Sequence, residues 1–403
     1  MRSHLALLAG AALLASVLPA AADVSGGVVR IGVLNDQSGL YADNTGPGSV
    51  IAARMAVEDY GGKVLGKPVE VVFADHQNKA DIGSNITRQW VDQEGVDAIA
   101  DVGNSAVALA VQSITREKNR IHLNTGAASS DLTGKDCSPT GFSWAYDTYA
   151  LASGTGKALV KQGGDTWFFL SADYSFGQAL ERDTSKFVKE AGGTVLGSVR
   201  VPLNTSDFSS FLLQAQGSGA KVIGLANAGG DTINSIKQAA EFGITKGGQS
   251  LAGLLVFLSD VHGLGLDKAQ GLMVTETFYW DLNDQTRAWS KRFGAQHGGK
   301  MPSMVHAGVY ASVLHYLKAV EAGNTDDGTK TIAKMKELPT DDPLFGKGTI
   351  RADGRKLHPA YLFQVKKPSE SKGPYDYYTL KATIPADQAF RPIDQGDCPL
   401  VKK

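Results

Sequence analysis

Two glycine-containing segments have residue types that cradle phosphate groups in nucleotide-binding proteins. Gly46-Pro-Gly48 resembles the start of a dinucleotide-binding fingerprint, but Ile51 stands where the third glycine should be. Gly154-Thr-Gly156-Lys157 resembles a phosphate-binding loop, but Leu151 occupies the position of its first glycine and Ala158 replaces the Ser or Thr that would bind Mg²⁺. Because each segment lacks a required residue, we predict that neither binds a nucleotide, and no cofactor is predicted.

Side chains that perform nucleophilic or metal-assisted catalysis form no recognisable pattern. The sequence has no G-x-S-x-G, no H-E-x-x-H and no C-x-x-C motif. Its 8 histidines are scattered, and the separation of His306 and His315 places them on opposite sides of a helix. We therefore predict no metal site and no enzyme. A hydrolase built from dispersed residues stays open as an alternative, because catalytic triads need not be close in sequence.

Small and polar residues gather directly after four predicted strands. Ligands of open α/β sheets bind beyond the carboxyl ends of the strands. Backbone N–H groups at the start of a helix favour an anion there. These loops therefore predict a cleft for a small organic carboxylate, with aromatic side chains on one of its walls. The loops are residues 103–105, 125–130, 173–177 and 227–231.

Alternating strands and helices must position these loops. The first series has predicted strands at 28–34, 69–73, 97–102 and 121–124, with helices at 48–60, 81–93 and 105–118 between them. The second has strands at 167–170, 195–201, 222–226 and 251–257, with helices near 176–187, 207–216 and 232–242. Alternation at this spacing predicts an α/β fold with two doubly wound lobes.

The last third of the sequence departs from this alternation. A strand is predicted at 271–278, helices near 285–297 and 303–322, and antiparallel strands at 348–351, 360–365 and 377–380. No internal linker is rich enough in Pro or Ser to separate two independent domains. We therefore expect several short strands to cross between the lobes.

Composition excludes several classes of protein. The 403 residues are 42% hydrophobic and 20% charged, which is enough to bury sizeable cores and argues against global disorder. The 40 Lys and Arg against 41 Asp and Glu give a net charge of −1, and no basic run appears. That balance leaves no electrostatic footprint for nucleic acid. The 47 glycines lack a fixed period and suit many tight turns between strands and helices.

The first 22 residues have the pattern of a secretory signal peptide. Arg2 and His4 precede the apolar stretch 5–18, and Pro19-Ala-Ala-Ala22 ends it, so cleavage is predicted after Ala22. Pro19 interrupts the apolar run too early for a membrane-spanning helix. No cysteine follows the run to accept a lipid. The mature chain is therefore predicted to be exported to the periplasm without an anchor.

Export changes how the 2 cysteines are interpreted. An oxidising compartment permits a disulfide. Cys137 lies in a turn-rich segment, and Cys398 lies near the end of the chain. A disulfide between them would fix the C-terminal tail to the body of the protein. Two free buried thiols are the alternative.

Five segments together resemble the Leu/Ile/Val-binding periplasmic proteins of ABC transporters. Their order and spacing carry the resemblance, which extends over about residues 28–366. The family implies a type I periplasmic-binding-protein-like fold, in which two lobes joined by three hinge crossings enclose a ligand. The crossings would fall near 144–148, 273–277 and 358–361. The five segments are residues 28–34, 54–58, 131–133, 173–177 and 271–274.

The resemblance also implies how the chain divides. A signal peptide would occupy residues 1–22. The first lobe would combine 28–145 with 276–357, and the second would combine 147–273 with 360–384. A C-terminal tail would occupy 385–403.

Ligand-binding residues are implied by register with the family. Its carboxylate-binding serine segment falls on Asn104 and Ser105, and its Gly-Ala-Thr segment falls on 126–128, where Ala128 replaces the threonine. Its tyrosine after the third strand of the second lobe has become Ala228, and its ammonium-binding glutamate falls at about 259–260. The candidate site residues are Tyr41, Asn104, Ser105, Ala127, Ala128, Tyr174, Phe176, Asn227 and Asp260.

These departures bear on the ligand. Two contacts to an α-amino group are weakened while the carboxylate site is kept, and a buried ammonium that lost a partner would cost about 1–3 kcal/mol. We therefore expect a carboxylate without an α-amino group, such as an aromatic acid packed on Tyr41, Tyr174 or Phe176. Branched-chain amino acids stay open, because Asp231 or Asp260 could supply the charge.

The resemblance implies a solute-binding protein that works without turnover. It would act as a monomer and deliver a small carboxylate to the membrane permease of an ABC transporter. A ligand-sensing relative that regulates a partner is the alternative within the same fold. The exported hydrolase described above is the alternative outside it.

Overall fold

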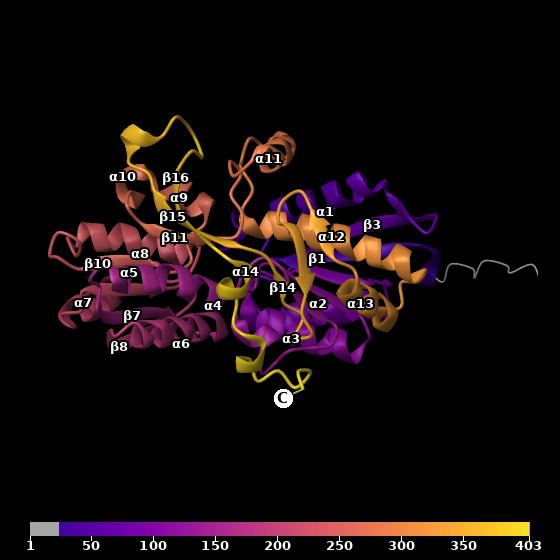
Figure 1. Ribbon diagram of the computed structural model, residues 1–403, viewed down its shortest axis with the longest axis horizontal. Coiled ribbons are helices and arrows are strands. Elements are labelled where there is room, and N and C mark those ends of the chain that lie inside the picture. The colour runs from indigo at the N-terminus through magenta and orange to yellow at the C-terminus, as the bar shows by residue number, and fades with distance from the viewer. Residues whose placement is uncertain (1–23, 403) are drawn as a thin grey trace, which may run out of the picture.

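The computed structural model describes residues 24–402 as two α/β lobes that lie side by side (Figure 1). The first lobe is built on a six-stranded sheet with the order β2-β3-β1-β4-β5-β6, parallel except for β2. Its strands are β1 (Val29–Asn35), β2 (Lys63–Val64), β3 (Lys67–Asp75), β4 (Ala98–Asp101), β5 (Ile121–Asn124) and β6 (Gly141–Ser143).

Helices cover both faces of the middle of this sheet, which explains why β1, β4 and β5 are buried without alternation. Successive residues of a strand point to opposite faces. Val33 of β1 packs in one buried cluster with α1 and α12, whereas Leu34 packs in another with α2 and α3. The helices of this lobe are α1 (Gly46–Tyr60), α2 (Ala80–Asp92), α3 (Ser105–Glu117), α11 (Asp284–Gln296), α12 (Met304–Gly323) and α13 (Gly328–Glu337).

The second lobe is built on a four-stranded parallel sheet with the order β10-β9-β7-β8. Its strands are β7 (Thr166–Ala172), β8 (Thr194–Val201), β9 (Val222–Ala226) and β10 (Ser250–Gly253). Its helices are α4 (Thr148–Leu151), α5 (Lys157–Lys161), α6 (Ser175–Glu190), α7 (Ser209–Gly217), α8 (Gly230–Glu241), α9 (Leu258–Leu264) and α10 (Leu266–Ala269). The predicted strand at 251–257 is wrong in its last four residues, because the chain leaves the edge of the sheet after Gly253 and runs into α9.

A third, antiparallel sheet joins the lobes. It consists of β11 (Met273–Glu276), β15 (Ala360–Val365) and β16 (Tyr378–Ile384), in the order β11-β15-β16. The chain passes between the lobes three times, from β6 to α4, from β11 to α11 and from β14 to β15. A small antiparallel sheet of β12 (Thr340–Asp342), β13 (Gly346–Ile350) and β14 (Lys356–Leu357) precedes the last crossing. This arrangement confirms the predicted fold class.

The glycines of the segment that resembles a phosphate-binding loop serve helix packing instead. Residues 148–161 form one continuous helical stretch, with a π-helical turn at Ala152–Gly156 between α4 and α5. A Cβ placed on Gly154 would lie 2.3 Å from Oγ1 of Thr275 on β11. Glycine is therefore needed here so that the helix can lie directly against a hinge strand.

The C-terminal segment runs down between the two lobes (Figure 1). The predicted disulfide between Cys137 and Cys398 is confirmed, with 5.6 Å between the two Cα atoms. Arg391 donates a hydrogen bond of 2.8 Å to the Ser130 carbonyl of the first lobe. On the second lobe, Lys186 of α6 donates one of 3.3 Å to Gln395. The segment therefore contacts both lobes and is covalently fixed to one of them.

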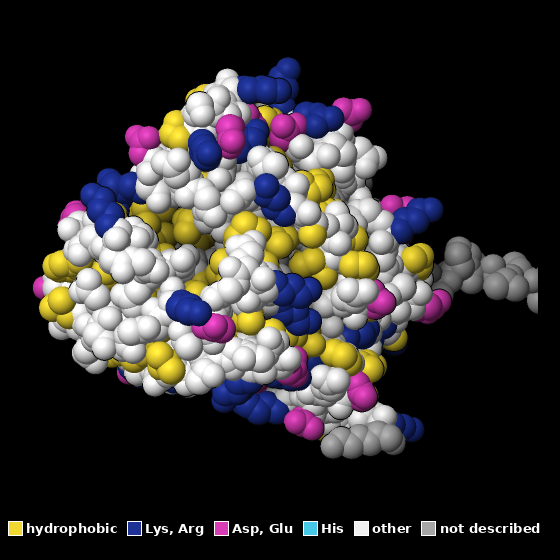
Figure 2. Space-filling view, turned by 60° about the vertical axis from the view of Figure 1, so that its left-hand side comes forward, with side chains coloured by type: hydrophobic (Ala, Val, Ile, Leu, Met, Phe, Trp, Pro, Cys, Tyr) yellow, Lys and Arg dark blue, Asp and Glu magenta, His cyan; other side chains and the backbone are white. Residues whose placement is uncertain are grey.

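Two further sequence predictions concern the surface and the N-terminus. On the face shown in Figure 2, Lys and Arg side chains are spread out among Asp and Glu, as the near-neutral net charge leads one to expect. Within residues 24–402, no helix is both long enough and apolar enough to cross a membrane. The predicted signal peptide, 1–22, lies outside the described residues.

Replacing both Cys137 and Cys398 by Ser should lower the free energy of unfolding by about 2–4 kcal/mol, because the disulfide closes a long loop and restricts the unfolded chain. Denaturant-induced unfolding of the purified variant measures the change. The wild-type protein in the presence of a reductant is the control and should show the same loss. Equal stability of all three samples would contradict a stabilising role for this disulfide.

Candidate functional site

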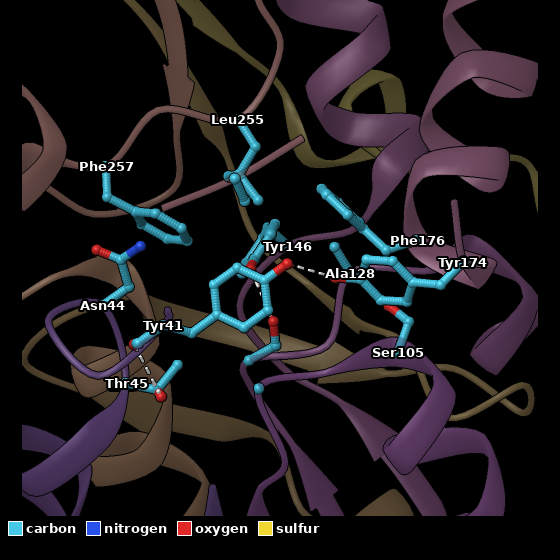
Figure 3. Close-up of a pocket in the computed structure, with 13 residues that line it drawn as sticks. Tyr41, Asn44, Thr45, Ser105, Ala128, Tyr146, Tyr174, Phe176, Leu255 and Phe257 are labelled. Carbon is cyan, nitrogen blue, oxygen red and sulfur yellow. Dashed lines mark hydrogen bonds between the residues drawn. The ribbon is translucent and has the colours of Figure 1, made fainter. Parts of the chain in front are cut away.

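A small cavity lies between the lobes, at the carboxyl ends of the strands of both main sheets (Figure 3). The free space inside it is about what one water molecule needs, so the lobes are closed tightly on each other. Both lobes and the first crossing supply its walls. The lining residues are Tyr41, Asn44, Thr45, Gly103, Ser105, Gly126, Ala128, Tyr146, Tyr174, Phe176, Ala228, Leu255 and Phe257.

The first-lobe wall comes from loops that follow three neighbouring parallel strands. Tyr41, Asn44 and Thr45 follow β1, Gly103 and Ser105 follow β4, and Gly126 and Ala128 follow β5. Because β1, β4 and β5 are adjacent in the sheet, their carboxyl ends meet at one edge.

The backbone at the end of β4 is strained where it approaches the cavity. Asp101 has a φ of 74° and Val102 a φ of 56°. Positive φ is a rare conformation for a β-branched residue, and such strain concentrates at functional sites. This sharp change of direction precedes Gly103, which lines the cavity.

The second-lobe wall is formed in the same way. Tyr174 and Phe176 follow β7, Ala228 follows β9, and Leu255 and Phe257 follow β10. Figure 3 shows Leu255 and Phe257 facing the side chains of the first lobe across the cavity.

Two tyrosines join the lobes across the cavity. The hydroxyl groups of Tyr41 and Tyr174 are hydrogen-bonded at 2.7 Å (Figure 3). Burial raises the pKa of both phenols above its ordinary value, so both are neutral. The pair links a first-lobe loop to a second-lobe loop, and the structure is therefore of the closed arrangement.

Ser105 offers a hydrogen-bond donor at the first-lobe wall. Its Oγ accepts a hydrogen bond of 3.1 Å from the Ser129 N–H, and no bond donated by its own hydroxyl is found within residues 24–402. Ser105 is also the first residue of the 13-residue helix α3, whose N-terminal end carries partial positive charge. A hydroxyl donor at a helix N-terminus is suited to an anion.

The structure brings five of the nine predicted site residues to the cavity and places the other four behind its walls. Those that line it are Tyr41, Ser105, Ala128, Tyr174 and Phe176. The other four are Asn104, Ala127, Asn227 and Asp260, each engaged in hydrogen bonds that shape the adjoining loop.

Asn104 caps α3, since its Oδ1 accepts hydrogen bonds from the N–H groups of Ala106 and Val107. The Ala127 N–H donates to the Asn124 side chain. Both residues therefore hold first-lobe loops in place.

Asn227 and Asp260 do the same in the second lobe. Asn227 donates to Ser235 and accepts from Thr232. Asp260 caps α9 by accepting a hydrogen bond of 2.9 Å from the Phe257 N–H.

The sequence prediction missed Asn44, Thr45, Tyr146, Leu255 and Phe257. Asn44 and Thr45 follow a predicted strand, so the strand-end rule could have found them. Leu255 and Phe257 fall within the predicted strand 251–257, which conceals them. Tyr146 lies in a hinge crossing, and its hydroxyl donates a hydrogen bond of 2.7 Å to the Gly126 carbonyl.

No charged side chain is among the lining residues. Asp231 and Asp260 are the two acids that the sequence suggested as partners for a ligand ammonium. Both are buried, and neither lines the cavity. Burial raises the pKa of Asp231 to about 6 and that of Asp260 to about 7. The cavity therefore presents aromatic rings, hydroxyls and backbone to a ligand.

Comparison with known proteins agrees with this architecture. The chain is 27% identical over 363 residues to the Leu/Ile/Val-binding protein homolog 6 of Brucella melitensis, which covers 84% of this chain and 88% of the relative. A crystal structure of a periplasmic binding protein from Burkholderia mallei is 53% identical, with a TM-score of 0.92, and covers 93% of this chain and 100% of the other. The periplasmic ligand-binding protein of a branched-chain amino acid ABC transporter from Burkholderia xenovorans is 41% identical, with a TM-score of 0.81, and covers 92% of this chain and 99% of the other.

A family model described as periplasmic binding protein matches residues 28–374. The match spans both main sheets and two of the three strands of the hinge sheet. This match agrees with the resemblance to Leu/Ile/Val-binding proteins found in the sequence. The Brucella relative confirms that resemblance. The chain belongs to the periplasmic binding protein family.

Proposed function

We propose that this chain is the extracytoplasmic solute-binding protein of an ABC importer, and that it closes its lobes on a small aromatic carboxylate. The observation that carries the proposal is the cavity itself, which is enclosed by both lobes, uncharged and lined by five aromatic rings. Those rings belong to Tyr41, Tyr146, Tyr174, Phe176 and Phe257.

The carboxylate end of the ligand is assigned to the first-lobe wall. Ser105 supplies a hydroxyl donor, and the N-terminus of α3 adds partial positive charge. Hydrogen bonds to a charged group contribute more than neutral ones in a site from which water is excluded. These groups are sufficient to orient one carboxylate without a Lys or Arg.

The aromatic end is assigned to the space between the phenol pair and the second-lobe wall. Tyr174 and Phe176 lie with their ring centroids 5.9 Å apart on one side, and Phe257 lies on the other (Figure 3). Burying an aromatic ring against such surfaces is favourable, and ring–ring contacts add about 0.5–1.5 kcal/mol each. No lining side chain is a carboxylate, so an ammonium placed here would lack a direct ionic partner.

A branched-chain amino acid is the second candidate ligand. The 41% identical relative serves a branched-chain amino acid transporter by its description, which favours that class. Asp231 and Asp260 lie just behind the wall and could approach an ammonium if the loops that they cap shifted.

Binding would act by stabilising the closed arrangement, since only there do both lobes touch the ligand. Besides the phenol pair, the closed lobes are joined by a hydrogen bond of 2.7 Å from Ser130 to Asp183. Ser259 of the second lobe also donates to Asn44 of the first. Such contacts require no chemical step, so we propose recognition without turnover. Export through a cleaved signal peptide, a monomeric state and delivery to a permease complete the proposal.

Thermal-shift screening of benzoate, 4-hydroxybenzoate, leucine and valine tests the ligand class. A ligand at about 100 times its dissociation constant should add about 2.7 kcal/mol to the free energy of unfolding. We expect the aromatic acids to give the larger shift. Benzamide is the control for the carboxylate and should bind much more weakly than benzoate. Stabilisation by leucine but not by either aromatic acid would contradict the aromatic assignment.

The Ser105→Ala variant tests the carboxylate position. Loss of one hydrogen bond to a charged group costs about 1.5–3 kcal/mol, so the dissociation constant should rise about 10- to 100-fold. Ser113→Ala is the matched control, because Ser113 is exposed on the same helix, and it should bind like wild type. Isothermal titration calorimetry with benzoate measures both. Unchanged affinity of Ser105→Ala would remove Ser105 from the site.

The phenol pair can be tested by a double-mutant cycle. Tyr41→Phe and Tyr174→Phe should each weaken binding about 2- to 10-fold, because each leaves one buried hydroxyl without its partner. Their effects should not add, since both remove the same inter-lobe hydrogen bond. Tyr60→Phe, whose hydroxyl bonds to Glu321 outside the cavity, is the control. Fully additive effects would show that the two hydroxyls act separately.

A further inference from the structure

Four buried carboxyl groups surround the cavity without a cationic partner. Asp101, Asp231, Asp260 and Glu276 are each at most 2% exposed. None of them forms an ion pair with a Lys, Arg or His within residues 24–402. Oδ1 of Asp231 and Oε2 of Glu276 make no hydrogen bond there either.

Several buried acids elsewhere in the chain pair with a cation. Asp147 pairs with Arg355 at 3.2 Å in the hinge. Asp353 pairs with Arg351 at 2.5 Å. Asp36 and Asp326 are also buried without an ion pair within residues 24–402, but both accept hydrogen bonds from backbone N–H groups.

Asp260 lies where the second lobe meets the first. Asp260 belongs to α9 of the second lobe, and its Oδ2 accepts a hydrogen bond from the Phe257 N–H. The Asn44 amide of the first lobe interacts with its carboxyl, and Ser259 binds the same Asn44. Phe257 and Asn44 both line the cavity. Opening the lobes would withdraw Asn44 and expose Asp260 to water.

Glu276 is buried at the end of hinge strand β11. The titratable groups that face it are Asp260 of α9, Tyr378 of β16 and Tyr146 of the first crossing. On its other side, Asp260 faces Asp43 of the loop before α1. None of these groups is a cation.

Two carboxyls that are both buried and lack a cationic partner cannot both stay ionised at little cost. Burial is the main cause that raises the pKa of Asp260, to about 7, and that of Glu276, well above its ordinary value. A carboxylate ligand would add a further negative charge to the same region.

We propose that Asp260 and Glu276 together take up a proton from solvent when the lobes close on an anionic ligand. The inference rests on the proposed function, because it requires the ligand to be a carboxylate. The proton adds to a carboxylate oxygen of one of the two acids. The ligand brings one negative charge and the proton removes one, so the net charge of the protein does not change on binding. The bound state then holds more protons than the free state, and affinity for the anion rises as the pH falls.

Calorimetric titration of the wild-type protein with benzoate at about pH 6.5, in phosphate and in a buffer of larger ionisation enthalpy, measures the proton directly. The observed heats should differ in proportion to uptake of up to about one proton. The dissociation constant should increase from about pH 5.5 to about pH 7.5, by up to about tenfold per pH unit. Benzoate stays ionised throughout, because a carboxyl in water has a pKa near about 4.

Asp260→Asn alone and the Asp260→Asn/Glu276→Gln double variant test the assignment. The single variant should reduce the proton uptake, and the double variant should abolish it and flatten the pH dependence. Asp97→Asn is the matched control. Asp97 is buried, with a pKa raised to about 7, but it pairs with Arg120 inside the first lobe and does not face the cavity. That variant should keep the full uptake.

The outcomes separate the two proposals. Equal heats of benzoate binding in both buffers would overturn proton uptake while leaving the proposed function in place. Full uptake by the folded Asp260→Asn and double variants would overturn the assignment to this pair. Absence of binding heat with benzoate and with 4-hydroxybenzoate would contradict the aromatic-acid function and this inference with it.

Discussion

The closed state of this protein depends on polar contacts between loops that belong to different lobes. The hydrogen bond between the hydroxyls of Tyr41 and Tyr174 joins the loop after β1 to the loop after β7. Ser130 and Asp183 form a second link near the hinge. The loops that carry Tyr41 and Tyr174 each follow a parallel strand, so the sheets behind them fix their positions. The cavity exists because these two sets of loops meet over it.

The electrostatic character of the cavity follows from the same arrangement. Its surface is aromatic and uncharged, whereas buried carboxyls stand one layer behind it. Asp260 shows how the two layers are connected, because its carboxyl caps α9 by binding the Phe257 N–H while the Phe257 ring lines the cavity. The Asp260 carboxyl therefore fixes the shape of the loop and also determines the charge behind the cavity wall. A ligand that changes one of them must affect the other.

The hinge must keep its shape while the lobes move. Gly154 allows the π-helical turn to lie directly on Thr275 of β11, and Arg355 pairs with Asp147 beside the first crossing. The C-terminal segment contacts both lobes and is joined to the first by the Cys137–Cys398 disulfide. A packed hinge of this kind favours rigid rotation of whole lobes over local deformation, because close-packed interiors do not deform continuously.

The sequence by itself determined the two-lobed α/β fold, since strand and helix periodicity, glycine-rich turns and apolar strands such as β1 depend on local patterns. Order and spacing also identified the family, and the strand-end rule led to Ser105, Tyr174 and Phe176. Only the tertiary structure showed that Asp260 caps a helix, because a capping side chain and a ligand-binding one occupy the same loops. Phe257 was not predicted as a site residue because it belongs to a short apolar segment. Such a segment has the pattern of a buried strand even where the chain has already left the sheet. The pairing of Tyr41 with Tyr174 and the missing cations around the cavity are relations between distant segments, and only the folded chain brings those segments together.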